Sequence, residues 1–146
     1  KKKKKKKKVK KKKKKNKKNS KIKIIKFFST IKKKKKKLLK KLDIIKKQDK
    51  IIHGYGASTK GNVLLQYFGI DKKYIDYIAE RNENKFDLYT PGTNIKIISE
   101  NESRNKKPDY YLVLPWHFKN QILRRERKML KKGVKFIFPL PNIKVN

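Results

Sequence analysis

The chain has 146 residues, with 48 lysines and arginines against 11 acidic residues and a formal net charge of +37. Residues 1–50 hold 30 of the basic residues and 2 of the acidic ones, so residues 51–146 are only mildly basic. The absence of cysteine excludes disulfides, thiolate zinc sites and a cysteine nucleophile within this chain. No apolar run approaches the roughly 20 residues of a membrane-spanning helix, and no secretory signal is recognisable, so we expect a cytoplasmic protein without a membrane partner.

Residues 1–19 form a lysine tail in which only Val9, Asn16, and Asn19 interrupt the lysines. Such a run repels itself and buries nothing, which predicts disorder. One interpretation is an electrostatic arm that binds nucleic acid non-specifically. The other, which we favour, is an unselected homopolymer, because the Lys, Asn and Ile bias of the chain fits an A/T-rich coding sequence.

Residues 20–48 carry apolar side chains at helical spacing. The positions that step by three or four residues are Ile24, Phe28, Ile31, Leu38, Leu42 and Ile45. This pattern predicts a basic amphipathic helix or helix pair whose apolar face packs on the following domain. A basic amphipathic helix can also lie on a membrane or meet a partner.

Residues 49–146 alternate strand-like and helix-like segments, which predicts a mostly parallel sheet with right-handed crossovers. Strands are expected at 51–55, 74–79, 95–98, 110–114 and 134–138, and helices at 59–68, 100–106 and 117–132. We therefore predict an α/β fold, a small Rossmann-like three-layer sandwich preceded by the basic helix and the disordered tail.

A glycine turn follows the first predicted strand and opens the first predicted helix. Gly54, Gly56 and Gly61 do not form a Walker loop, because Asn62 and Val63 stand where a lysine and then a serine or threonine are required. They are not a clean dinucleotide fingerprint either, because the third glycine comes two residues late. A helix start after a glycine turn nevertheless attracts phosphate. The polar residues of this turn are Ser58, Thr59, Lys60 and Asn62; the alternative is a tight turn with a solvated lysine.

Glu80 ends the second predicted strand, 24 residues beyond Gly56. Rossmann folds place a ribose-binding carboxylate at about this position. The same turn and Glu80 would also suit a regulatory domain that binds a nucleotide or NAD, so this remains an alternative.

Two further segments follow predicted strands, where an open α/β sheet binds ligands. Tyr89, Thr90 and Thr93 surround a Pro-Gly turn that could clamp a sugar or base, or be an ordinary turn. Trp116 could stack on a ring and His117 could hydrogen-bond, although a lone histidine opening a helix is more often structural. We expect His53 to be packed. No catalytic set or metal-ligand cluster emerges from the sequence, so catalytic residues stay unknown and binding is expected rather than catalysis.

Five segments in order resemble one known family. They are GYGASTKGN followed by LLQYFGI, then YIAERNENK, LYTPGTNI, YYLVLPWHF and KFIFPLP. Together they resemble the C-terminal domain of the S-adenosylmethionine-dependent C-methyltransferases that act on nucleotide-linked deoxysugars. The resemblance runs from about residue 51 to residue 143 and implies a Rossmann-like domain that supplies much of the sugar-nucleotide site.

The resemblance also implies a zinc domain and a methyl-donor domain upstream, and neither their cysteines nor a methyl-donor loop occurs here. S-adenosylmethionine therefore belongs to the full-length family, and no cofactor is expected in this chain. We predict the substrate-binding third of such an enzyme, a fragment inactive alone, with a nucleotide-linked sugar as ligand; a separate methyl-donor chain is a candidate partner. The implied placement puts Ser58, Thr59, Lys60 and Asn62 at the pyrophosphate, Glu80, Arg81 and Asn82 near the nucleoside, and Tyr89, Thr90 and Thr93 along the crevice.

Overall fold

The structure is a computed structural model that describes the backbone of residues 2–146 and the side chains from residue 20 onward. The chain divides into two compact units, residues 1–36 and residues 37–146. The second unit holds the sheet and its helices. The boundary between the units lies inside the segment for which the sequence predicts a basic helix.

Helix α1 (Lys2–Lys46) is one continuous helix, not the helix pair that the sequence also allows. It runs through the lysine tail as well, where the sequence predicts disorder. Lysine has good helix propensity, and neither glycine nor proline occurs before Gly54. In its last turns, which belong to the second unit, Leu38 and Leu42 are fully buried. Ile24 and Phe28, in the first unit, are exposed.

Six strands form one sheet in the order β3-β2-β1-β4-β5-β6, with parallel pairing except between β5 and β6. The strands are β1 (Ile52–Tyr55), β2 (Tyr77–Glu80), β3 (Lys96–Ser99), β4 (Tyr110–Val113), β5 (Lys135–Phe138) and β6 (Lys144–Val145). The predicted α/β, Rossmann-like class is confirmed. Two details of the prediction are wrong: β2 begins three residues later than predicted, and the short antiparallel strand β6 was not foreseen.

Helix α2 (Thr59–Phe68) has the predicted bounds, because clear chemical signals mark both of its ends. The Ser58 hydroxyl accepts a hydrogen bond from the Gly61 amide at its start, and Gly69 adopts the left-handed conformation, φ 69°, at its end. Helix α3 (Glu100–Asn105) starts after Ser99, which caps it as predicted.

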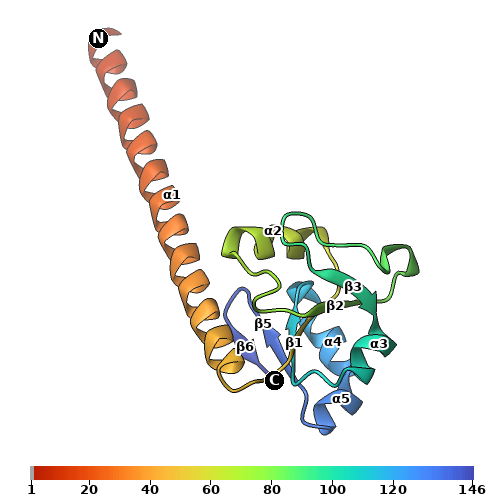
Figure 1. The fold of residues 1–146 in the computed structure, drawn as a ribbon. Helices are drawn as coiled ribbons and strands as arrows, with labels where there is room; N and C mark the ends of the chain where they lie inside the picture. The colour runs from red at the N-terminus through yellow and green to blue at the C-terminus, as the bar shows by residue number, and fades with distance from the viewer. Residues whose placement is uncertain (1) are drawn as a thin grey trace. The chain divides into compact units, whose positions relative to one another are not determined.

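The predicted helix over residues 117–132 is instead three short pieces: the 3₁₀ helix η2 (Trp116–Phe118), α4 (Lys119–Arg125) and α5 (Arg127–Lys131). The break falls at Glu126, which leaves helical geometry with φ −93° and ψ 19°. Glu126 is buried and hydrogen-bonded to side chains beneath the helices, and its burial coincides with the break. Figure 1 shows α2 on one face of the sheet and α3, α4 and α5 on the other.

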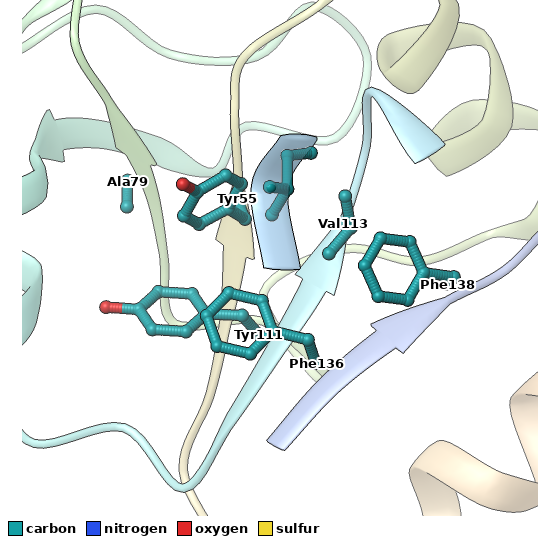
Figure 2. Close-up of a cluster of buried hydrophobic side chains, with 7 residues drawn as sticks. Tyr55, Ala79, Tyr111, Val113, Phe136 and Phe138 are labelled. Atoms are coloured by element: carbon teal, nitrogen blue, oxygen red, sulfur yellow. The ribbon is translucent and has the colours of Figure 1, made fainter. Parts of the chain in front are cut away.

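Alternate residues of the central strands face the layer of α4 and α5 and form an aromatic core (Figure 2). The Tyr111 and Phe136 rings stack with centroids 5.2 Å apart, and Tyr55 meets Phe136 edge to face at 5.6 Å. The buried members of this core are Tyr55, Ala79, Tyr111, Val113, Ile122, Phe136 and Phe138. The rigid core fixes where the carboxyl ends of β1 and β4 lie.

Candidate ligand-binding site

A cleft of about 590 Å³ opens at the carboxyl ends of β1, β2 and β4. This is the edge at which open α/β sheets bind ligands. Its walls combine the glycine turn, the segment after β2, the start of α3 and one face of α4. The lining residues are Tyr55, Gly56, Ala57, Ser58, Thr59, Glu80, Arg81, Lys85, Glu100, Pro115, Phe118, Gln121, Ile122 and Arg125.

The glycine turn lies beside the Pro115 segment, as the prediction of a shared ligand edge requires. Gly56 has φ 78°, and a side chain there would meet the Pro115 ring at 3.0 Å. Gly61 faces Leu114, where a Cβ atom would approach the Leu114 Cβ to 2.5 Å. Two of the glycines are therefore explained by close packing between the turn and the residues that follow β4.

The Glu80 carboxylate clamps the two loops that form one wall of the cleft. One oxygen accepts from the Arg81 and Asn82 amides at 2.7 and 3.0 Å, and the other accepts from the Ala57 amide at 2.7 Å. Lys85 Nζ lies 3.7 Å from the carboxylate and donates to the Ala57 carbonyl at 2.8 Å. The carboxylate thus ties the glycine turn to the segment after β2.

This clamp changes the expected role of Glu80. A carboxylate has about four acceptor positions, and here three backbone amides occupy three of them while Lys85 approaches the fourth. A ribose hydroxyl of NAD or of S-adenosylmethionine would need one of these positions. The residues around Glu80 therefore do not fit a nucleotide cofactor held in the usual Rossmann manner, and we derive no methyl-transfer step through this chain.

The opposite wall carries a cluster of charged groups centred on the buried Glu126. Its carboxylate accepts from the Tyr55 hydroxyl at 2.7 Å, from Arg125 Nε at 3.0 Å and from Arg104 at 3.3 Å. Arg125 also contacts the Tyr55 hydroxyl and the Glu100 carboxylate, and its guanidinium lies 5.3 Å from the Tyr55 ring centre. Burial, and then the hydrogen bond to Glu126, raises the pKa of the Tyr55 hydroxyl, so Tyr55 stays protonated and acts as the donor.

The cluster presents Arg125 to the cleft in a fixed orientation, since three partners hold its guanidinium. Arg81, which is exposed, and the half-buried Lys85 also line the cleft. The charged lining groups are thus three cations, Arg81, Lys85 and Arg125, and two carboxylates, Glu80 and Glu100, both engaged by neighbouring groups. A cleft of this kind can receive an anionic ligand with polar and ring-shaped parts.

Of the predicted site residues, Ser58, Thr59, Glu80 and Arg81 line the cleft. Sequence reasoning missed Tyr55, Lys85, Glu100, Phe118, Gln121 and Arg125. The position of Glu100 directly after β3 was a usable signal, because it lies at the same sheet edge. Arg125 had none, since it reaches the cleft only through the packing of α4.

Other predicted residues have structural roles away from the lining. The Thr90 and Thr93 hydroxyls are buried and lie 2.7 Å apart, and Thr90 also accepts from the Ile95 amide, so they hold the Pro-Gly turn. Asn82 caps the 3₁₀ helix η1 (Glu83–Lys85) by accepting from the Asn84 amide. The residues that lie outside the lining are Lys60, Asn62, Asn82, Tyr89, Thr90, Thr93, Trp116 and His117.

Trp116 and His117 also lie outside the lining. Trp116 packs against the aromatic core instead of facing the cleft. His117 is exposed, with its ring 4.2 Å from the Phe118 ring, and it is Phe118 that lines the cleft. Within this 3₁₀ turn, Phe118 and not Trp116 lines the cleft.

His53 is buried, as predicted. Its Nδ1 lies 2.8 Å from the Ser103 hydroxyl, which in turn lies 2.8 Å from the Tyr111 hydroxyl. Burial lowers the pKa of His53 from 6.5 to about 4, so the ring is neutral at pH 7. His53 therefore belongs to a buried hydrogen-bond chain between β1, α3 and β4.

Among the described side chains, no group of three metal-ligating residues comes together, and no described helix combines the length and hydropathy needed to cross a bilayer. Comparison with known proteins identifies a matching family and a similar curated protein. The sequence profile of the C-methyltransferase C-terminal domain matches residues 1–141. The C-methyltransferase NovU of Streptomyces niveus is 35% identical over 96 residues, which are 66% of this chain and 23% of that protein. This chain belongs to the C-methyltransferase C-terminal domain family.

Proposed function

We propose that the cleft binds a nucleotide-linked sugar and that this domain is the substrate-binding part of an S-adenosylmethionine-dependent C-methyltransferase. The chain spans about a quarter of the length of the curated relative that it matches, 23%. Methyl transfer itself is therefore assigned to a longer protein or to a partner chain that carries the methyl donor, and this chain alone is expected to bind without catalysing.

The observation that carries the proposal is the joint lining of one cleft by the glycine turn, by Arg81 and by Arg125 at the ligand edge of the sheet. The first turn of α2 points unpaired amides outward, because Ser58 caps only the Gly61 amide. Guanidinium groups suit phosphate oxygens, with which they form paired hydrogen bonds. We assign the diphosphate to the start of α2 and to Arg81, and the sugar to the wall formed by Phe118 and Gln121.

The test is calorimetric titration with a thymidine-diphosphate deoxysugar. The parent protein should bind it, and Arg81→Ala should weaken binding by about tenfold or more, which corresponds to one lost charge-assisted hydrogen bond. Arg124→Ala is the matched control, because Arg124 is an exposed arginine of α4 that does not line the cleft.

Two results would count against the proposal. Equal weakening by Arg81→Ala and Arg124→Ala would mean that only the net positive charge of the chain attracts the nucleotide. Tight binding of NADH without binding of the sugar nucleotide would favour the regulatory nucleotide-binding domain instead. A Lys60→Ala variant tests whether Lys60 lies at the pyrophosphate, because Lys60 was predicted there but lies outside the lining of the cleft.

A further inference from the structure

The first compact unit of the chain contains an unusual run of exposed apolar side chains. Within seven residues of α1, five large apolar side chains are 41 to 66% exposed: Ile22, Ile24, Ile25, Phe27 and Phe28. We call this run the Ile22–Phe28 segment. Single exposed apolar residues need no explanation, but a contiguous group of them marks an interaction surface.

The charges around this segment are of one sign. Residues 1–42 contain no acidic residue, and lysines lie both within the segment and on either side of it. At helical spacing Ile24 and Phe28 lie on one face, with Ile25 and Phe27 beside them, whereas Lys23 and Lys26 lie toward the opposite side. The segment therefore carries four of its apolar side chains on one side and its two lysines on the other, where Ile22 lies beside Lys26.

The two hydroxyl groups that directly follow the segment are already hydrogen-bonded within the helix. The Ser29 and Thr30 hydroxyls each donate to the Lys26 carbonyl at 2.9 Å. The two phenylalanine rings meet edge to face at 5.8 Å, which makes one aromatic surface. Moving this part of the helix into an apolar environment would thus leave no side-chain hydroxyl without a partner.

Although the sequence alone predicts no membrane partner, we propose that the Ile22–Phe28 segment lies on an anionic lipid bilayer, with its two phenylalanines, Ile24 and Ile25 among the acyl chains and its lysines at the headgroups. Aromatic and aliphatic residues on one face with lysine on the other are the features of interfacial helices. Lysine near an anionic membrane surface adds attraction, and the long lysine side chain reaches the headgroups while its stem stays apolar. Nucleic acid would use the lysines and could stack bases on the two phenylalanines, but it gives the exposed isoleucines no role. A second copy of so basic a chain would be repelled.

The test is flotation of the full chain with vesicles of phosphatidylcholine alone or mixed equally with phosphatidylserine. The protein should float with the anionic vesicles and not with the neutral ones. In the double variant Phe27→Ser and Phe28→Ser, binding to anionic vesicles should fall by about tenfold or more, because two large apolar side chains are lost from the buried face. The matched control is Val63→Ser with Tyr67→Ser, which removes two exposed apolar side chains from α2 and should leave binding unchanged.

A second readout separates insertion from attraction by charge. In a Phe27→Trp variant, anionic vesicles should shift the emission to the blue, whereas the parent, whose one tryptophan is Trp116, half-buried against the aromatic core, should show no shift. Part of the binding should also survive about 1 M salt, where the screening length is about 3 Å. The proposal is overturned if the double serine variant binds as well as the parent, if neutral vesicles bind equally, or if the segment is needed for binding a homopolymeric RNA but not for binding vesicles.

Discussion

The Tyr55 hydroxyl lies 2.7 Å from Oε1 of Glu126 and donates a hydrogen bond to that buried carboxylate across 71 residues of sequence. Glu126 is 3% exposed and also accepts from Arg104 and Arg125. One carboxylate thus joins the end of β1 to α3 and to the break between α4 and α5. The position of Arg125 in the cleft depends on this junction.

Replacing Glu126 with alanine should lower the free energy of unfolding by about 2–4 kcal/mol, because Arg104, Arg125 and the Tyr55 hydroxyl lose a shared buried acceptor. Urea unfolding measures the change. Glu102→Ala is the control: Glu102 is exposed, pairs with Lys106 at 3.6 Å and should cost less than about 1 kcal/mol. Similar losses in the two variants would contradict the central role of Glu126.

The buried His53 should make stability depend on pH. Its pKa is about 4 in the folded chain and near 6.5 when unfolded, so below pH 6.5 the unfolded state binds a proton that the folded state does not. The free energy of unfolding should hold the full contribution of His53 above about pH 6.5. It should fall by about 1.4 kcal/mol per pH unit as the pH drops toward 4.

Urea unfolding between those pH values should show this dependence in the parent and in His117→Gln, since His117 is exposed. In His53→Gln the difference in the free energy of unfolding between pH 6.5 and pH 4.5 should shrink to the part that the carboxylates contribute. An unchanged difference in His53→Gln would mean that His53 titrates normally in the folded chain.

The Glu80 carboxylate should hold the glycine turn against the segment after β2. In Glu80→Gln one oxygen becomes an amide donor, so at least one of the three backbone amides loses its acceptor, at a cost of about 1–3 kcal/mol. Hydrogen exchange at the Ala57 amide should become about tenfold faster or more. Glu83→Gln, an exposed change in η1, should leave this exchange rate as it is; acceleration in both variants would place the protection elsewhere.

The lysine part of α1 should respond to salt. Lysines three and four residues apart repel one another on a helix, and screening weakens this repulsion. The helical signal in circular dichroism should therefore increase with ionic strength in the full chain, while the urea midpoint of the sheet unit stays nearly constant. A signal that does not change with salt would mean that the like charges are not limiting helix formation.

Elements marked by local chemistry could be predicted from the sequence. Ser58 and Gly69 define α2 because one supplies a cap oxygen and the other tolerates φ 69°. The parallel sheet could likewise be predicted, because strand-like and helix-like segments alternate. These signals come from residues that are close together in the sequence, so they can be recognised without knowing the fold.

The features that could not be predicted depend on contacts between residues that are far apart in the sequence. The helix over residues 117–132 is interrupted at Glu126, which has partners 22 and 71 residues away, Arg104 and Tyr55. The sequence predicts that the Glu80 carboxylate binds a ligand, but in the structure this carboxylate accepts a hydrogen bond from the Ala57 amide, 23 residues earlier. The residues next to Glu80 in the sequence give no sign of this contact. Trp116 was predicted to face a ligand because an aromatic residue after a strand can stack on a ring, but the 3₁₀ turn directs Phe118 there instead.

The most direct test of the ligand cleft is to map a thymidine-diphosphate deoxysugar onto the protein by amide chemical shifts. The largest changes should occur at Thr59, Arg81 and Gln121, which come from three separate parts of the chain and share only the cleft. Changes concentrated at residues 89–93, or spread evenly over the lysines of α1, would contradict the assignment of the nucleotide sugar to this cleft.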